Sequence, residues 1–479
     1  MLRHLWISLF LFSYAITGWS QPWIAPDNLS LRSSITYLQQ QGIIHGPITT
    51  WPLAWQSLVA DLNHCVQQPL SSNITHLCQM LLNEYHANQT SQINVQAYAA
   101  NDQALLNSFD KNHRGKSGTQ FNFSTQDQYW SGQLSLNQID ASTDHHAINL
   151  DGSYLATHSN HWALGVGAVD RWWGPGWDSS LIVSTNPRPI PGLFLTRTTN
   201  KPFESTWLNW IGPWNFTTTL GQLESNREIP HALFLGMRFN FQPWTPLEIG
   251  LSRTAIWGGE GRSHSLNTLG NLLIGYDNVG GAEEPGNQLA GFDATLSFPI
   301  KNYTSAVYFQ YIGEDEAGGL PAKSLGLAGV SLSKANRNNH WTAFLEASDT
   351  AVNILSSDDF NIAYEHHLYT DGYRYYGRAI GSTYDNDTHT LTAGLTGTVN
   401  EIHQFSATAS NINFNLDGNG SNGLVNGAQK SQRYAFSYQQ KNALADWGFT
   451  LSTLTHLPDN KMLVNNEDNL VFFVSKDFK

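Results

Sequence analysis

A cluster of tyrosine, histidine and carboxylate side chains between residues 364 and 376 is the first stretch of this sequence whose residue types could do chemistry. Aromatic rings and carboxylates are groups that contact sugars, and Glu365 and Asp371 could form the acid and base pair of glycoside cleavage. Carboxylates on an aqueous loop are more often solvated or paired with an arginine such as Arg374, so we expect binding without catalysis. The adjacent His366 and His367 would point to opposite sides of an extended chain, which disfavours a metal site. The candidate binding residues are Tyr364, Glu365, His366, Tyr369, Asp371, Tyr373, Arg374, Tyr375 and Tyr376.

A second candidate segment runs from Asp170 to Gly192 and is rich in tryptophan and proline. Proline fixes φ and removes amide donors, so this segment must be a shaped loop and not a helix or a central strand. Its rings could stack on sugar rings while its charged side chains bond hydroxyls or uronic carboxylates. The alternative, which we favour for Trp172 and Trp173, is that the rings pack the loop and belt it at a membrane interface. The candidate residues here are Asp170, Arg171, Trp172, Trp173, Trp177 and Arg188.

Two motifs of enzymes, the dinucleotide-binding fingerprint and the serine-hydrolase nucleophile elbow, do not occur in the chain. The glycines at 258, 259 and 261 precede a polar loop and not a helix with a downstream acidic residue, so they are not a dinucleotide fingerprint. The sequence has no GxSxG nucleophile elbow. We therefore expect no cofactor, no metal and no enzymatic activity.

Composition points to a secreted chain. Residues 1–20 predict a signal peptide, with a basic start, an apolar run and a cleavage site near Ser20. Only 13% of the residues are charged and the formal net charge is -13, which makes nucleic acid an improbable partner. Cys65 and Cys78 are expected to form a disulfide in an oxidising compartment, the alternative being two buried thiols. No later stretch approaches the 18 or so apolar residues of a membrane-spanning helix.

Residues 21–92 show helical periodicity. Leu31, Ile35 and Leu38 share one face of a first helix, which Gly42 ends. A second helix is expected after Pro52, placed in its first turn, and a third around residues 74 to 85. About 70 residues are marginal alone, so we expect this small bundle to pack against the rest of the chain.

From residue 93 to residue 479 the hydrophobic period is two. Eighteen strands are predicted, each with an apolar and a polar face, and their connections mostly alternate between short and long. In the predicted strand 146–156, for example, the apolar face consists of Ile148, Leu150 and Tyr154. The connection at 199–213 is longer than this alternation expects. The eighteen predicted strands lie near residues 93–101, 118–126, 128–139, 146–156, 161–169, 190–198, 214–224, 231–241, 246–256, 289–299, 303–313, 324–333, 340–349, 388–399, 403–414, 432–440, 446–456 and 469–478.

An even strand count, alternating connections and an aromatic C-terminal strand favour an all-β transmembrane barrel over a soluble sandwich, because apolar faces turned to lipid need no second sheet. Parity then places both chain ends and the helical bundle in the periplasm and the tryptophan-rich loop outside. An eighteen-strand lumen is wide enough for water, so loops or helices must fill it unless the protein is a pore.

Several long stretches carry a resemblance to a known family: LRSSITYLQQQGIIHGPITTWPLAW, LDGSYLA, WALGVGAVDRWWGPGWDSSLIVSTNPRPIPG, WIGPWNFTTTLGQLESNREIPHALFLGMRF, LEIGLSRTAIWGGEGR and AYEHHLYTDGYRYYGRAIG. Together they resemble the capsule assembly Wzi family over nearly all of the mature chain. The resemblance implies a monomeric outer-membrane lectin of a Gram-negative bacterium that holds capsular or related exopolysaccharide at the cell surface. Its further partners would be outer-membrane lipid, the barrel-assembly machinery and polysaccharide export components. A sugar-permeable porin is the alternative function, and an outer-membrane hydrolase is third.

Overall fold

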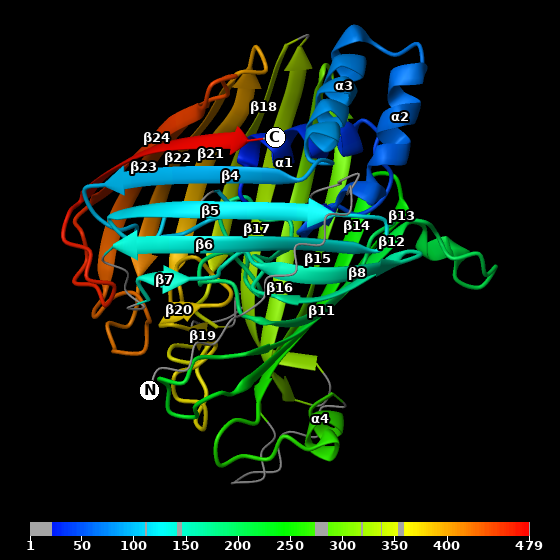
Figure 1. Cartoon of the computed structure of the whole chain (residues 1–479). Helices are drawn as coiled ribbons and strands as arrows, with labels where there is room; N and C mark the ends of the chain where they lie inside the picture. Colours follow the sequence, from blue (N-terminus) through cyan, green and yellow to red (C-terminus); the bar gives the residue numbers. More distant parts are fainter. Residues whose placement is uncertain are drawn as a thin grey trace, which may run out of the picture.

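A single closed antiparallel barrel dominates the structure, a computed structural model that describes residues 22–110, 113–140, 146–273, 286–317, 320–336, 338–352 and 359–478 (Figure 1). The predicted signal peptide lies outside these residues. The barrel closes where the last strand pairs with the first, with Phe478 opposite Ile93. Its strands are β4 (Gln92–Ala100), β5 (Ser117–Gln126), β6 (Trp130–Asp140), β7 (Ile148–Asn149), β8 (Tyr154–Ser159), β9 (Trp162–Gly167), β11 (Gly192–Arg197), β12 (Trp214–Gln222), β13 (Leu233–Trp244), β14 (Leu247–Trp257), β15 (Gly286–Ile300), β16 (Tyr303–Ala317), β17 (Leu320–Asn336), β18 (Asn339–Asp349), β21 (His389–Val399), β22 (His403–Phe414), β23 (Gln429–Gln440), β24 (Asp446–Thr455) and β25 (Asp468–Phe478).

The short β7 and the longer β8 both pair with β6, so together they form one interrupted strand of an eighteen-strand barrel. Each of the eighteen predicted strands overlaps an observed one, which confirms the predicted fold class. The interruption corrects one assignment. A turn at Gly152, where φ is 90°, resets the alternation, so that Tyr154 is buried inside the barrel and Leu155 is 53% exposed outside.

The outer surface of the barrel is apolar. Large hydrophobic side chains alternate along the strands with their side chains outward, for example Phe121 and Phe123 on β5 and Leu134 and Leu136 on β6. In the same strands the inward positions carry amides and hydroxyls. Water is a poor solvent for such an exterior, and the hydrocarbon core of a membrane is a good one.

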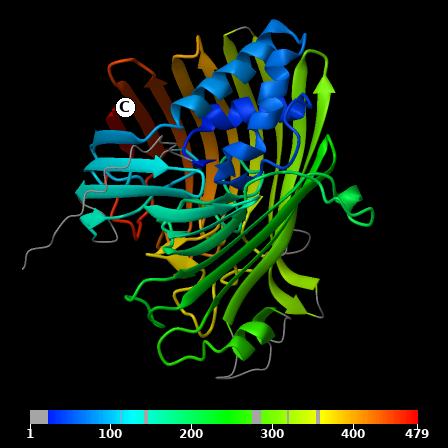
Figure 2. The ribbon, with the colours of Figure 1, turned by 45° about the vertical axis from the view of Figure 1, so that its right-hand side comes forward.

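The first helix, α1 (Leu29–Gln40), plugs one end of the lumen (Figure 2). Asn28 caps its N-terminus, because the side-chain oxygen accepts the Leu31 amide at 2.8 Å. Its serines face the polar inner wall: Ser33 Oγ lies 2.6 Å from the hydroxyl of Thr342, and Ser34 Oγ lies 2.7 Å from the ring of His340. The predicted first helix is therefore inside the barrel, held there by hydrogen bonds to inward-facing strand residues.

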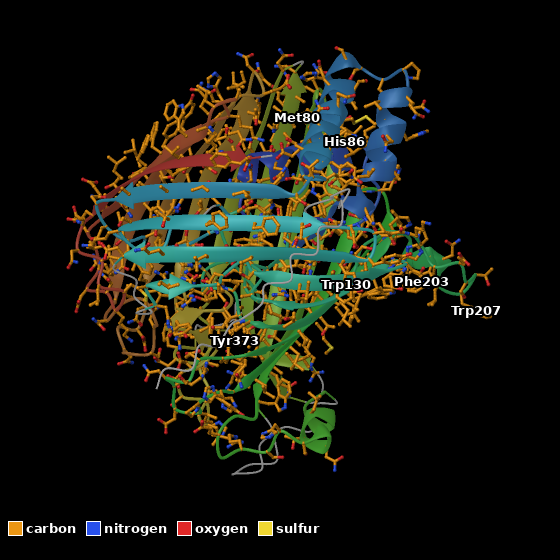
Figure 3. The ribbon with its side chains drawn as sticks, viewed as in Figure 1. Met80, His86, Trp130, Phe203, Trp207 and Tyr373 are labelled. Carbon is orange, nitrogen blue, oxygen red and sulfur yellow. A yellow bond between two sulfur atoms is a disulfide. The ribbon has the colours of Figure 1, made fainter. Side chains whose placement is uncertain are left out.

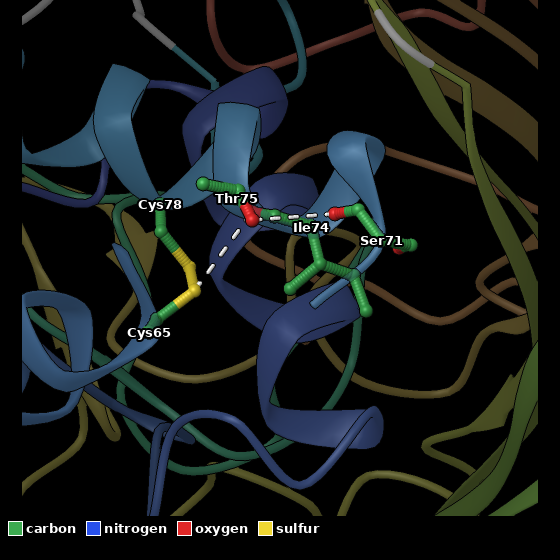
Figure 4. Close-up of a disulfide and its surroundings, with 5 residues drawn as sticks. All are labelled: Cys65, Ser71, Ile74, Thr75 and Cys78. Carbon is green, nitrogen blue, oxygen red and sulfur yellow. Dashed lines mark hydrogen bonds between the residues drawn. A yellow bond between two sulfur atoms is a disulfide. The ribbon is translucent and has the colours of Figure 1, made fainter. Parts of the chain in front are cut away.

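The other two helices lie beyond the barrel rim and are joined to each other. The disulfide between Cys65 and Cys78 links α2 (Val59–Gln67) to α3 (Ser72–Ala87), and the Thr75 hydroxyl donates to the Ser71 carbonyl at 3.3 Å (Figure 4). Closing so short a loop stabilises by about 3 kcal/mol in the chain-entropy model. No helix within the described ranges is long and apolar enough to cross a membrane.

Pro52 is not in the first turn of a helix, contrary to the prediction. It lies between β2 (Thr50–Trp51) and β3 (Leu53–Ala54), and only the short turn η1 (Trp55–Ser57) separates β3 from the start of α2. The reason is strand pairing: β2 pairs with β10 (Trp172–Trp173), and β3 pairs with β1 (Trp23–Ile24). These distant partners outweigh the local helical period.

The long connection between β11 and β12 projects sideways from the helix end of the barrel (Figure 3). It contains the turn η2 (Asn209–Ile211) and exposes Trp207 by 86% and Trp210 by 66%. Trp244, at the end of β13, is 68% exposed. Three solvent-facing tryptophans gathered at one rim are typical of a membrane-water interface.

Candidate functional site

The tryptophan-rich segment folds back into the lumen. Trp172 and Trp173 are fully buried and form β10, with Trp172 opposite Trp51 of the N-terminal unit. The packing role favoured for these rings is correct, but the interfacial belt is wrong, because Trp172 and Trp173 are buried inside the barrel. A wide lumen must be filled, and the large rings that this loop carries fill it.

Arg32 of α1 joins the helical plug to this loop. Its guanidinium carbon lies 4.4 Å from the centre of the Phe109 ring and 4.5 Å from that of Trp177, and it donates to the Pro175 carbonyl at 2.8 Å. Burial lowers the pKa of Arg32 to about 10, which leaves it charged at neutral pH. Sequence reasoning missed Arg32, because its polar position on a helix of mixed character gave no signal.

Two buried carboxylates of the barrel wall hold the plug in place. Glu346 accepts the backbone amides of Trp177 and Ser179 at 2.6 and 3.0 Å. Glu248 accepts the amides of Ile48 and Thr49 at 3.0 and 2.9 Å. Charge-assisted bonds to backbone amides fix both loop and N-terminal segment against the wall, so that much of the lumen is occupied by protein.

Most tyrosines of the 364–376 segment are structural. Tyr364, Tyr369 and Tyr373 are buried, and their hydroxyls donate to the carbonyls of Leu181, Gly258 and Ile182 at 2.8, 3.1 and 2.8 Å (Figure 3 labels Tyr373). They tie this loop to the buried tryptophan-rich loop and to the end of β14. A polymer outside the protein has no access to these three rings in this arrangement.

The two carboxylates considered as an acid and base pair are both engaged elsewhere. Glu365 accepts from Arg374 at 2.7 Å, and Arg374 also bonds Asp385. Asp371 accepts the backbone amide of Glu228 at 2.7 Å. Burial raises the pKa of Glu365, and the ion pair with Arg374 offsets only part of that rise. Within the described part of the chain, no three histidine, cysteine or acidic side chains come together to hold a metal.

His366, Asp170 and Arg171 are half-buried, and the adjacent Asp170 and Arg171 are close enough for their charges to interact. His366 stacks on His367 and its Nδ1 accepts the Leu368 amide at 3.1 Å. Arg171 donates to the Val169 carbonyl at 2.7 Å. Burial raises the pKa of Asp170 to about 6.

Two of the predicted segments do meet, at a half-buried group of side chains that we call the Arg188 corner: Asp151, Arg188, Tyr376 and His146. Arg188 donates two hydrogen bonds, of 2.8 and 2.9 Å, to the carboxylate of Asp151. Its guanidinium carbon lies 5.2 Å from the centre of the Tyr376 ring, whose hydroxyl is 2.9 Å from His146 Nε2. Tyr375 contacts the ring of Tyr376 edge-on.

At the Arg188 corner a planar cation whose side chain is 11% exposed lies beside a half-buried phenol ring and an exposed imidazole. Such a set suits hydroxyls and the flat C–H face of a sugar ring. Asp151 and His146 were not among the predicted site residues. The Asp151–Gly152 pair marks a turn within a strand, which was the available signal for Asp151.

The fold and its filled lumen define the class of protein: an outer-membrane-type β-barrel with a plugged interior. Residues 86–469 match the family described as capsule assembly protein Wzi, and the chain belongs to this family, as the resemblance predicted.

Two relatives show how close the match is. An uncharacterized 55.8 kDa protein in the cps region of Klebsiella pneumoniae is 31% identical over 336 residues, which span 69% of this chain and 66% of that protein. The match thus spans slightly less than two thirds of the relative. The solved structure of Wzi from Escherichia coli, described as a carbohydrate-binding β-barrel involved in group 1 capsule assembly, superposes with a TM-score of 0.84 at 25% identity. That match covers 95% of this chain and 99% of that structure.

Proposed function

We propose that this protein binds capsular or related exopolysaccharide at the outer surface and helps to assemble or anchor it there, without cleaving it. The observation that carries the proposal is the close match of the whole barrel, plug included, to a carbohydrate-binding barrel of the same family. In this proposal the loop end that bears the Arg188 corner faces the medium, and the helices α2 and α3 face the periplasm. The protein acts as a monomer, inserted by the barrel-assembly machinery and surrounded by outer-membrane lipid, with export components meeting it from the periplasmic side.

The Arg188 corner is the best-supported contact site within this proposal. Its side chains come from three different segments and remain partly accessible, whereas Tyr364, Tyr369 and Tyr373 are buried. Arg374 is also buried and is saturated by Asp385 and Glu365. We therefore assign polysaccharide contact to Arg188 and Tyr376, and a supporting role to the other tyrosines.

Absence of catalysis is supported by the state of the two candidate carboxylates. A general acid needs a free, suitably placed proton, and a base needs a free lone pair. Glu365 is paired with Arg374, and Asp371 caps a loop amide. Incubation of the protein with its native polysaccharide should release no reducing ends.

Deletion of the gene, followed by assay of cell-bound and shed polysaccharide, tests the function. A shift of polysaccharide from the cell-bound to the shed fraction is expected, and re-expression of the parent protein should reverse it. Purified protein on beads should also retain polysaccharide isolated from the same cells. If deletion leaves the distribution unchanged and the beads retain nothing, the proposed function is wrong.

A further inference from the structure

A cavity of about 380 Å³ remains inside the barrel, between the inner faces of β4, β5 and β6 and the plug. We call it the β4–β6 cavity. Its lining includes Asn88 and Asp477 at the helix end and Asp151 and Pro189 at the loop end. Because Asp151 is also held by Arg188, the cavity begins directly beneath the Arg188 corner.

Amide side chains dominate the wall of this cavity. An amide both donates and accepts hydrogen bonds, which matches the hydroxyl groups of a sugar. Gln96 is 2% exposed, and among the described residues neither its side-chain oxygen nor that of Asn122 has a hydrogen-bond partner. Three aromatic side chains, Trp23, Tyr98 and Tyr154, complete the wall. The lining amides are Asn88, Gln92, Asn94, Gln96, Gln120, Asn122, Gln133, Asn137 and Asn149.

The alternation of the strands makes this wall a distinct polar stripe. On β5, Gln120, Asn122 and Ser124 line the cavity. Phe121 and Phe123, between them, are each 41% exposed on the outer surface. Burying this many amides without full pairing is costly, so the stripe is better explained by a polar content of the cavity than by packing.

The charges around the cavity are mainly negative. Among the described residues of the lining, arginine occurs only as Arg114, and its guanidinium donates to the carbonyls of Thr185, Asn186 and Pro187. Arg188 balances Asp151 from outside the lining. An acidic sugar would meet net repulsion here, and an uncharged sugar would not. The acidic lining residues are Asp27, Asp110, Asp151, Asp170 and Asp477.

We propose that the β4–β6 cavity binds uncharged sugar residues of the polysaccharide that the Arg188 corner contacts. The proposal rests on the proposed function and extends it inward: the corner meets the polymer outside, and the amide wall receives a short neutral segment or chain end. The lining carboxylates repel acidic sugars and so favour neutral ones, and the lining amides form hydrogen bonds with the sugar hydroxyls.

Cysteine labelling of β5 tests this inference directly. The sequence has only two cysteines, and both are in the Cys65–Cys78 disulfide, so an introduced thiol is the sole reactive site. Asn122→Cys places a thiol on the cavity wall, and Phe121→Cys, the matched control, places one on the lipid-facing surface. Each full-length variant in detergent is treated with a small cationic methanethiosulfonate reagent, and the labelling rate is read by mass spectrometry.

We expect Asn122→Cys to react and maltohexaose, a neutral probe, to slow its labelling about fivefold once the free probe reaches about four times its Kd. A hexamer of galacturonic acid should leave the rate unchanged, and neither oligomer should protect Phe121→Cys. Gln120→Cys serves as a second cavity variant if Asn122→Cys does not fold.

Three results would overturn the inference: an unreactive cavity thiol in both variants, labelling that maltohexaose does not slow, or equal protection by both oligomers. Retention of native polysaccharide on beads is measured in parallel with the parent protein. If the parent protein retains the polysaccharide but maltohexaose does not protect the cavity thiol, the cavity site is refuted and the proposed function stands. If the parent protein does not retain the polysaccharide, the proposed function itself is refuted.

Discussion

The guanidinium of Arg188 lies over the ring of Tyr376, with 5.2 Å between its carbon and the ring centre. The two residues come from loops far apart in the sequence, and both were candidates for sugar contact on composition alone. The same guanidinium is fixed by two hydrogen bonds to Asp151. A cation held in this way is oriented before any ligand arrives, which lowers the entropy cost of binding.

Arg188→Lys should weaken polysaccharide retention about tenfold, because lysine keeps the charge but loses the planar fork and the stacking on Tyr376. Bead-bound protein and labelled native polysaccharide give the measurement. Arg262→Lys is the matched control, since Arg262 lies over Tyr369 at 5.4 Å in a different loop. If both variants retain as much polysaccharide as the parent, the Arg188 corner is not part of the binding site.

Arg32→Ala should loosen the plug. The substitution removes the cation that lies against the Phe109 and Trp177 rings and its hydrogen bond to the Pro175 carbonyl, a loss of about 3 kcal/mol. In planar bilayers we expect a silent parent and intermittent channel openings in the variant. A parent that conducts steadily would favour the sugar-permeable porin, and a variant as silent and as protease-resistant as the parent would refute the role of Arg32.

Asp387 makes the loop end sensitive to pH. Burial and then the neighbouring carboxylates of Asp417, Glu365 and Asp385 raise the pKa of Asp387 to about 7, against 3.8 ordinarily. Between about pH 4 and pH 7 the folded state therefore holds a proton that the unfolded state has lost, and stability falls as the pH rises through this window.

Asp387→Asn should accordingly melt like the parent near pH 4 and be more stable at pH 8, on the order of 1 kcal/mol after allowance for solvent screening. Thermal melts in detergent at the two pH values supply the comparison. Asp359→Asn, at an acidic residue outside this cluster, is the control. A parent melting curve that does not change between pH 5 and pH 8 would contradict the expectation.

Trp207 and Trp210 are expected to insert into the membrane-water interface. Their exposure of 86% and 66% is costly in water and is relieved by lipid, and the outer apolar belt of the barrel begins beside them. A spin label at Trp207→Cys in reconstituted vesicles should be more accessible to oxygen than to a polar nickel complex. Gln79→Cys on the exposed side of α3 should show the opposite preference. The same water-like signal at both positions would place the β11–β12 connection outside the membrane.

The strands of the barrel could be predicted from the sequence because the membrane imposes a strictly local pattern. Each strand must turn one face to lipid, so Phe121 and Phe123 alternate with Gln120 and Asn122 regardless of what the lumen contains. The prediction was wrong where a non-local contact was stronger than the local period. Tyr154 turns inward to pack on Trp23 with 4.6 Å between the ring centres.

The candidate site was predicted only in part. The sequence identified Arg188 and Tyr376 as residue types suited to sugar contact, but it assigned the same role to Tyr369 and Tyr373, which are buried. Composition cannot distinguish a ring that meets a ligand from a ring that fills a lumen, since both need the same apolar surface. Arg32 and Asp151 were missed because the residues they contact, such as Phe109 for Arg32 and Arg188 for Asp151, lie far from them in the sequence.

By itself the sequence determined that the chain forms a barrel of eighteen strands with an apolar exterior, because apolar and polar residues alternate along each strand. Only the tertiary structure decided what fills the barrel: Trp172 set against Trp51, Arg32 enclosed by Phe109 and Trp177, and an amide-lined cavity left beside β5. These arrangements depend on which segments meet across the lumen, and no local pattern encodes the meeting of residues so far apart in the sequence.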